Sequence, residues 1–238
     1  MRDCADRDQA GSIVMGADPA SLYGKDYVNR FEKSQSIERL RRLLPLMNLT
    51  PQSYVADFAC GNGMLMELVA PIVREYAGVD FSQHFIDAAN RKKAHLAIHN
   101  ARFACASIED FCSEHPEYFD VALAMDVSEH IPDREWISIL GSIKSSLNSS
   151  GILYLHTPNA DFLLEIMKSK HFLVKQFREH IAVRNPGQNA EMLNRAGFSK
   201  IETTFLPHYN VLKYLQPLAS LPGVGRYFKA RIFIAAQK

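Results

Sequence analysis

The sequence predicts an α/β fold built on a mostly parallel sheet with helices on both faces. Short apolar runs alternate with stretches of helical spacing from residue 50 onward. The first of these runs enters a glycine-containing turn at Ala59–Gly63, and the second ends in an acidic residue, Asp80. Because strands separated by helices form βαβ units, this alternation favours a parallel sheet with right-handed crossovers.

The expected elements follow one another in regular order. Strands are predicted at 53–59, 75–80, 101–107, 119–126 and 151–157, and helices at about 63–74, 82–94 and 134–148. A polar segment then leads into AEMLNRAGF, a short helix closed by Gly197, and two further strands are expected in KIETTFL and ARIFIAA. The prediction is therefore a seven-stranded sheet whose last strand is antiparallel.

The predicted domain organisation has two parts. Residues 1–48 form an N-terminal tail and cap helices, and residues 49–238 form one domain. Within it, segments around 158–186 and 207–228 are expected to cover a substrate. The second segment is rich in Leu, Tyr and Pro, and three interpretations of it remain open: a lid over an apolar pocket, a surface that contacts a membrane or a second subunit, and ordinary core packing.

Composition narrows the class of protein. The formal net charge of the 238 residues is +1, so a large basic face for nucleic acid is not expected. The polar N-terminus lacks the apolar core of a signal peptide, and no long uncharged apolar run predicts a membrane span. We therefore expect a cytoplasmic protein that is a monomer or a homodimer, with peripheral membrane or lipid contact still possible.

The turn after the first strand has the features of a ligand site. A helix N-terminus presents unpaired N–H groups, and glycines let a ligand approach the backbone there. Asp80 ends the second strand, where an acid is placed to accept both hydroxyls of a ribose. Met66 stands where a dinucleotide fingerprint needs a third glycine, and no GK[ST] motif for nucleotide hydrolysis is present. The pattern therefore indicates a different nucleoside ligand.

Five stretches carry a resemblance to a known family: DFACGNG, GVDFS, FDVALAMDVSEHIPD, ILYLHTPN and EMLNRAGF. Together they resemble the class I S-adenosylmethionine-dependent methyltransferases of small molecules, in particular the group of ubiquinone-biosynthesis O-methyltransferases. The resemblance implies a Rossmann-like fold, S-adenosylmethionine as cofactor and S-adenosylhomocysteine as product. It further implies methyl transfer to oxygen, and less readily to nitrogen, of a natural product, sugar or lipid precursor in a biosynthetic pathway.

The resemblance also implies a set of cofactor-binding residues. Gly61 and Gly63 would let the backbone meet the methionine part, Asp57 would bind its ammonium through water, Asp80 would hold the ribose and Phe81 would lie against the adenine. The complete set is Tyr23, Asp57, Ala59, Gly61, Gly63, Asp80, Phe81, Ser107, Ile108, Met125 and Asp126.

Three of these positions carry a reservation. Ala59 replaces the first glycine of the family motif, which is tolerable if its φ is negative. Ser107 stands where the family has an acid for the adenine amine, so Ile108 is the safer contact through its N–H and apolar face. Tyr23 either closes over the cofactor or belongs to an aromatic stripe, with Tyr27 and Phe31, that packs on the sheet.

The candidate catalytic residues are His130, His156 and His180. Each follows or ends a strand, or lies in the segment expected to cover the acceptor, and each could act as a general base. The alternatives are a structural role for His130, a loop hydrogen bond for His156 and a plain surface position for His180. Glu129 is expected to organise the cofactor loop. No metal site is predicted, because His95 and His99 lack a third ligand and fit a surface helix.

Two rival functions remain open. The first is methylation of a protein or an RNA, against which the near-neutral charge and the absence of an NPPY-type motif after the fourth strand both speak. The second is a non-catalytic scaffold that binds S-adenosylmethionine.

Overall fold

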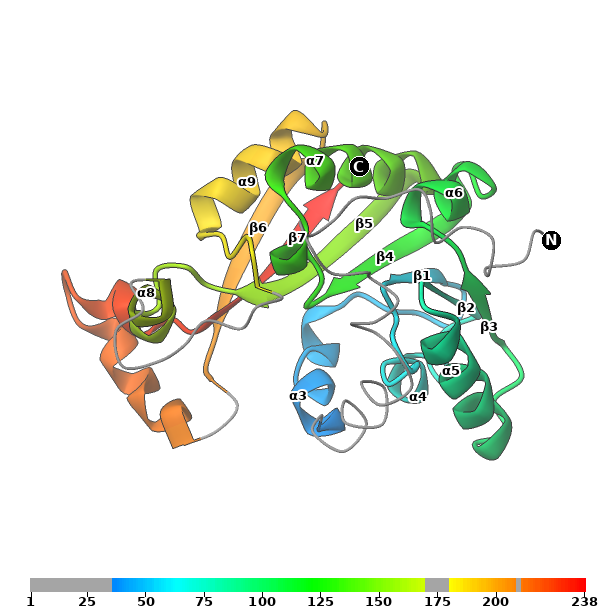
Figure 1. Cartoon of the computed structure of the whole chain (residues 1–238), viewed down its shortest axis with the longest axis horizontal. Helices are drawn as coiled ribbons and strands as arrows, with labels where there is room; N and C mark the ends of the chain where they lie inside the picture. Colours follow the sequence, from blue (N-terminus) through cyan, green and yellow to red (C-terminus); the bar gives the residue numbers. More distant parts are fainter. Residues whose placement is uncertain (1–35, 170–179, 209–210) are drawn as a thin grey trace, which may run out of the picture. The chain divides into compact units, whose positions relative to one another are not determined.

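The computed structural model describes residues 36–169, 180–208 and 211–238. The chain divides into two compact units, Met1–His115 and Pro116–Lys238, and each is described by itself. Figure 1 shows the elements of both units.

The first unit contains three parallel strands. They are β1 (Tyr54–Phe58), β2 (Glu75–Asp80) and β3 (Ala101–Cys105), in the order β3-β2-β1. Strands β1 and β2 are buried along almost their whole length, which explains their near-continuous apolar sequences. In the register, Asp57 lies opposite Gly78.

The helices of the first unit are short except for one. They are α3 (Ile37–Arg41), the 3-10 turn η2 (Leu44–Leu46), α4 (Met66–Val69), α5 (Gln83–His95) and α6 (Ile108–Ser113). Helix α4 is much shorter than the predicted 63–74. It ends before Pro71, because proline has no N–H group with which to continue the helical hydrogen bonds.

The second unit contains four strands. They are β4 (Phe119–Met125), β5 (Leu147–Pro158), β6 (Ser199–Leu206) and β7 (Arg231–Gln237), in the order β4-β5-β7-β6. Strands β4 and β5 are parallel, whereas β7 is antiparallel to both of its neighbours. Taken through both units, the strand order is β3-β2-β1-β4-β5-β7-β6, so the predicted seven-stranded, Rossmann-like fold class with an antiparallel last strand is confirmed.

The helices of the second unit connect these strands. They are the 3-10 turn η3 (Ser128–His130), α7 (Asp133–Ser146), α8 (Leu163–Ser169), α9 (Pro186–Arg195), η4 (Val211–Ser220) and η5 (Gly225–Phe228). In Figure 1, α7 and α9 lie side by side. Helix α9 begins with a capping box between Asn185 and Gln188 and is followed by Gly197 at φ +86°, as the sequence predicts.

Each unit has its own apolar core. Phe58, Tyr76 and Phe111 are fully buried in the first unit, and Trp136 and Leu153 in the second. Within the three described ranges of the chain, no helix combines the length and the hydropathy that crossing a membrane requires.

Candidate functional site

The loop after β1, residues 59–63, has a backbone that glycine suits. Gly61 and Gly63 have φ of +53° and +67°, and a Cβ on Gly63 would lie 2.9 Å from the Phe103 ring. Ala59 also has positive φ, +56°. The condition that makes alanine tolerable at position 59, a negative φ, is therefore not met, and the left-handed conformation costs about 1–2 kcal/mol there. The rest of the loop therefore holds Ala59 in a conformation that alanine by itself disfavours.

Asp80 fastens the loop to the carboxyl end of β2. Its Oδ2 accepts a hydrogen bond of 3.0 Å from the Gly61 N–H, and its Oδ1 accepts one of 2.9 Å from the Ser82 N–H. Burial raises the pKa of Asp80 to about 6, and the two N–H donors limit the rise. A carboxylate has about four lone-pair positions, so two acceptor positions remain for the hydroxyls of a ribose.

Asp57 and Asn62 add acceptor groups beside this loop. Asp57 is 3% exposed and its Oδ2 accepts a hydrogen bond from the Tyr76 hydroxyl. Burial raises the pKa of Asp57 to about 7, and the Tyr76 hydrogen bond opposes this rise. Asn62 is 2% exposed, and no donor in the described part of the chain reaches its Oδ1. A buried carboxyl and an unused amide oxygen are suitable acceptors for an ammonium group. We call residues 57–63 with Asp80 the cofactor cradle.

The titration of Asp57 predicts a pH-dependent effect of Asp57→Asn on stability. The folded carboxyl binds its proton more tightly than the unfolded one, so the stabilisation present below about pH 4 is lost as the pH rises towards 7. Asparagine carries no charge and still accepts the Tyr76 hydrogen bond. We therefore expect the variant's free energy of unfolding to gain on that of the wild type between pH 5 and 7, by up to about 1.4 kcal/mol per pH unit, and the gain to level off above pH 7.

Thermal unfolding of both proteins across this pH range measures the effect. Asp87→Asn, on the exposed side of α5, is the matched control and should show no such trend. A Tm difference for Asp57→Asn that does not change with pH would contradict the raised pKa.

The adenine-side residues follow β2 and β3. Phe81 is 55% exposed. Ser107 caps α6, because its Oγ accepts a hydrogen bond of 3.0 Å from the Asp110 N–H. Ile108 is the first residue of α6 and is half-buried. The helix cap explains why a serine stands at this position, and the adenine contacts remain predictions.

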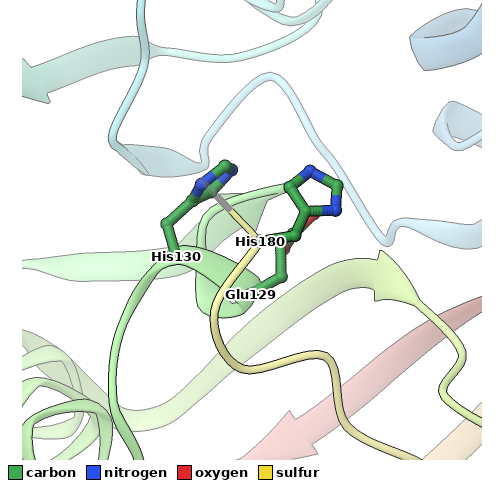
Figure 2. Close-up of side chains that lie close together, drawn as sticks. All are labelled: Glu129, His130 and His180. Atoms are coloured by element: carbon green, nitrogen blue, oxygen red, sulfur yellow. The ribbon is translucent and has the colours of Figure 1, made fainter. Parts of the chain in front are cut away.

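Glu129, His130 and His180 form a cluster in the second unit. One ligand-type atom from each side chain lies within 4.8 Å of the others, and the two imidazole rings are 5.0 Å apart between centroids. Figure 2 shows Glu129 and His130 on the turn η3, and His180 on the segment that precedes α9. Sequence reasoning named all three residues but gave no reason to place them together. We call this group the Glu–His–His cluster.

Burial shapes the electrostatics of this cluster. Glu129 is 1% exposed, accepts a hydrogen bond of 3.1 Å from the Thr157 hydroxyl, and has its pKa raised to about 7 chiefly by burial. The pKa of His180 is lowered to about 4, first by burial and then by the charges of His130, Lys168 and Arg231. His180 is therefore a neutral imidazole at neutral pH.

Arg184 fixes the segment that carries His180, and sequence reasoning missed it. Its guanidinium donates to the carbonyl oxygens of Ser128 (2.7 Å) and Ile131 (2.6 Å), and to the Asp133 carboxylate (2.9 and 2.8 Å). The residue is 3% exposed. Next to it, the Ala182 N–H donates to the Glu129 carbonyl. No local pattern reveals this role, because all the partners are distant in sequence.

Asp126, His156 and Arg231 form a second group at the ends of β4, β5 and β7. Nδ1 of His156 lies 2.9 Å from Oδ1 of Asp126, and Arg231 also donates to Asp126. His156 is 0% exposed, and the Arg231 Nε donates to its Nε2 at 3.4 Å. Both ring nitrogens of His156 thus have partners, which favours a positioning role over a catalytic one. Arg231 was also missed by sequence reasoning.

The structure says less about the other predicted cofactor-binding residues, which are Tyr23, Met125 and Asp126. Tyr23 lies outside the described residues. Met125 ends β4 and Asp126 follows it with φ +56°, a strained conformation for a residue other than glycine. Roles for these residues in binding the cofactor remain predictions.

A comparison with known proteins shows the family to which this chain belongs. The model of a family described as a methyltransferase domain matches residues 28–203, which is most of the chain. The chain belongs to this methyltransferase family. The methyltransferase is 26% identical over 164 residues to a ubiquinone biosynthesis O-methyltransferase of Thiobacillus denitrificans, which covers 66% of this chain and 69% of the relative. Its counterpart in Neisseria meningitidis serogroup C is 25% identical over 190 residues, or 74% and 76% of the two chains.

Solved structures agree on the fold of the methyltransferase. An S-adenosylmethionine-dependent methyltransferase from Archaeoglobus fulgidus superposes with a TM-score of 0.70 at 19% identity, covering 90% of this chain and all of the other. The magnesium protoporphyrin IX methyltransferase of Synechocystis, solved with bound S-adenosylhomocysteine, gives 0.61 at 20% identity, covering 92% and 91%. The methyltransferase is thus an S-adenosylmethionine-dependent enzyme, and the cradle's acceptors fit the ammonium and ribose of that cofactor.

Proposed function

We propose that this methyltransferase transfers a methyl group from S-adenosylmethionine to a hydroxyl oxygen of a small molecule. The observation that carries the proposal is the Glu–His–His cluster, in which Glu129 is buried and the two histidines are half-buried. A hydroxyl must lose its proton when its oxygen is methylated, and three proton-accepting side chains lie together there. The names of the relatives described above, which are O-methyltransferases, support the same reaction.

The cofactor cradle supplies the other half of the reaction. When bound, S-adenosylmethionine provides an electrophilic methyl group on its sulfonium. Asp80 would hold the ribose hydroxyls, and Asp57 with the Oδ1 of Asn62 would hold the ammonium. Glycine backbone at 61 and 63 leaves room for the methionine chain. Holding both reactants in line for attack can supply about 7–11 kcal/mol of the barrier reduction in favourable cases.

A small acceptor is favoured over a macromolecule. The net charge of +1 argues against a large basic surface for RNA. The sequence MDVSEH follows β4, in place of the proline-containing motif of enzymes that methylate amino groups in nucleic acids and proteins. We therefore propose a biosynthetic intermediate with a free hydroxyl group as the acceptor.

Two measurements test the proposal. Isothermal titration should show micromolar binding of S-adenosylhomocysteine, and heat indistinguishable from dilution would oppose a cofactor role. Isotopically labelled S-adenosylmethionine should then be incubated with metabolite extracts, and the labelled products identified. Label in a methyl ether supports the proposal, because methylation of a hydroxyl oxygen gives an ether. Label only in amines, protein or RNA overturns it, and binding of the cofactor without any labelled product points to the scaffold.

A further inference from the structure

We propose that Glu165 on helix α8 is a specificity-determining residue of the acceptor site, where its Oε2 accepts a hydrogen bond from a second polar group of the acceptor. This group is an uncharged O–H or N–H donor other than the hydroxyl that is methylated. The inference rests on the proposed function, because it describes how the acceptor of that reaction is recognised.

Helix α8 buries its charged side chains and exposes an apolar one. Glu165 is 8% exposed and Lys168 is 7% exposed, whereas Leu163 is 44% exposed. A helix that packs on a protein core normally shows the reverse pattern, with apolar residues inside and charged residues outside. A buried ion pair also adds little net stability, because the cost of removing both charges from water offsets their attraction. The burial of this pair therefore points to a role other than packing.

Only one of the two carboxylate oxygens of Glu165 has a hydrogen-bond donor. The Lys168 Nζ donates to Oε1 at 2.6 Å. The Oε2 atom is buried, and no donor in residues 36–169, 180–208 and 211–238 reaches it. A buried acceptor atom without a donor is costly, since it has lost its hydrogen bonds to water and gained none in return. A ligand that brings a donor to Oε2 would remove this cost.

The fold places α8 where a ligand is expected to bind. The helix follows the carboxyl end of β5, and ligands of open α/β sheets bind at this edge. The Ala160 N–H donates to the Arg184 carbonyl (3.2 Å), so the chain that leads into α8 is joined to the segment that carries His180 (Figure 1). The charge of Lys168 is one of those that lower the pKa of His180. The ion pair on α8 therefore lies within electrostatic range of the Glu–His–His cluster.

The charges of the pair indicate the kind of group that Oε2 would accept. Glu165 and Lys168 together carry no net charge. A cationic group at Oε2 would bring a second buried positive charge close to Lys168, and an anionic group would be repelled by Glu165. A hydroxyl or an amide N–H adds no charge, and its hydrogen bond to a carboxylate is stronger than one between neutral groups. An uncharged donor is therefore the best match.

Two variants of α8 test the role of Glu165. Wild type and variants are incubated with metabolite extracts and isotopically labelled S-adenosylmethionine. Every product that the wild type labels should carry a further hydroxyl or N–H group, and Glu165→Ala should reduce its formation at least about tenfold. The double variant Glu165→Met/Lys168→Met replaces both charges by apolar side chains, so it should lose the same activity while its Tm is no lower than that of the wild type.

Cofactor binding and a matched variant show whether the loss belongs to the acceptor site. Titration with S-adenosylhomocysteine should give an affinity within about threefold of the wild type for both variants, because the cofactor cradle lies in the first unit. Glu191→Ala, which removes an exposed carboxylate from α9, should label the same products at the wild-type rate. A double variant that unfolds at a lower temperature than the wild type and labels the same products would mean that the ion pair only stabilises the fold.

The acceptor itself provides the decisive comparison. Once a labelled product is identified, its parent compound is assayed beside an analogue in which hydrogen replaces the second polar group. The wild type should have a kcat/KM at least about tenfold lower for the analogue, whereas the double variant should treat both compounds alike within about threefold. Equal discrimination by the wild type and the double variant would overturn this proposal alone. A wild type that binds S-adenosylhomocysteine and labels no small molecule would overturn the proposed function, and this proposal with it.

Discussion

Replacing Asp80 with alanine should weaken the binding of S-adenosylhomocysteine at least about 100-fold. The carboxylate would accept the ribose hydroxyls, and each hydrogen bond to a charged group contributes about 1.5–3 kcal/mol. The same carboxylate accepts the Gly61 and Ser82 N–H groups, so its removal also takes away one of the contacts that hold the loop to β2. Calorimetric titration of wild type and variant measures the loss.

Two further variants show whether the effect belongs to the site. Asp80→Asn keeps one oxygen acceptor and should lose less affinity than Asp80→Ala. Asp87→Ala removes an exposed carboxylate on α5 and should bind like the wild type. If Asp80→Ala is folded in thermal unfolding and binds within threefold of the wild type, the ribose of the cofactor is not held by Asp80.

Changing Arg184 should disable the Glu–His–His cluster while sparing cofactor binding. Arg184→Ala leaves the Ser128 and Ile131 carbonyls without their buried donor, at roughly 1–3 kcal/mol for each group. The segment that carries His180 is then no longer tied to η3. We expect at least a tenfold loss in turnover. The affinity for S-adenosylhomocysteine should stay within about threefold, because the cofactor cradle lies in the first unit.

A double-mutant cycle separates this positioning role from a general loss of stability. If Arg184 acts through His180, turnover should be the same in His180→Ala with and without Arg184→Ala. Arg184→Lys keeps the charge but not the forked donors, so partial recovery is expected if the protein is folded. Arg195→Ala, an exposed arginine on α9, is the matched control. Fully additive losses would mean that Arg184 affects the cluster only through overall stability.

Several elements of the fold were predictable because their signals are local. The predicted strands 53–59 and 75–80 match β1 and β2 to within one residue at each end, since buried parallel strands have continuous apolar sequences. Helix α6 was missed, although Ser107 is a favourable N-cap residue, because six residues are too few to show a helical period. Helix α4 was predicted too long, because the apolar spacing continues past Pro71 while the helix ends before it.

Most of the cofactor cradle could be predicted from residue types, whereas the backbone conformation at one position of its loop could not. Glycine at 61 and 63 and an acid at the end of β2 indicate their roles by residue type alone. The positive φ of Ala59 is different, because alanine carries no signal for left-handed backbone. Surrounding contacts, such as the hydrogen bond from the Cys60 N–H to the Val79 carbonyl, hold the loop in a conformation that alanine disfavours.

By itself, the sequence determined the class of fold, the family and the position of the cofactor turn. These features depend on residue type and on spacing between neighbours along the chain. Only the tertiary structure decided which polar side chains of the second unit meet. Glu129 and His180 come together because Arg184 binds carbonyl groups more than fifty residues away, and His156 is set apart from them by its pairing with Asp126. Hydrogen bonds to backbone carbonyls impose no residue type on their partners, so the sequence contains no pattern from which such contacts can be deduced.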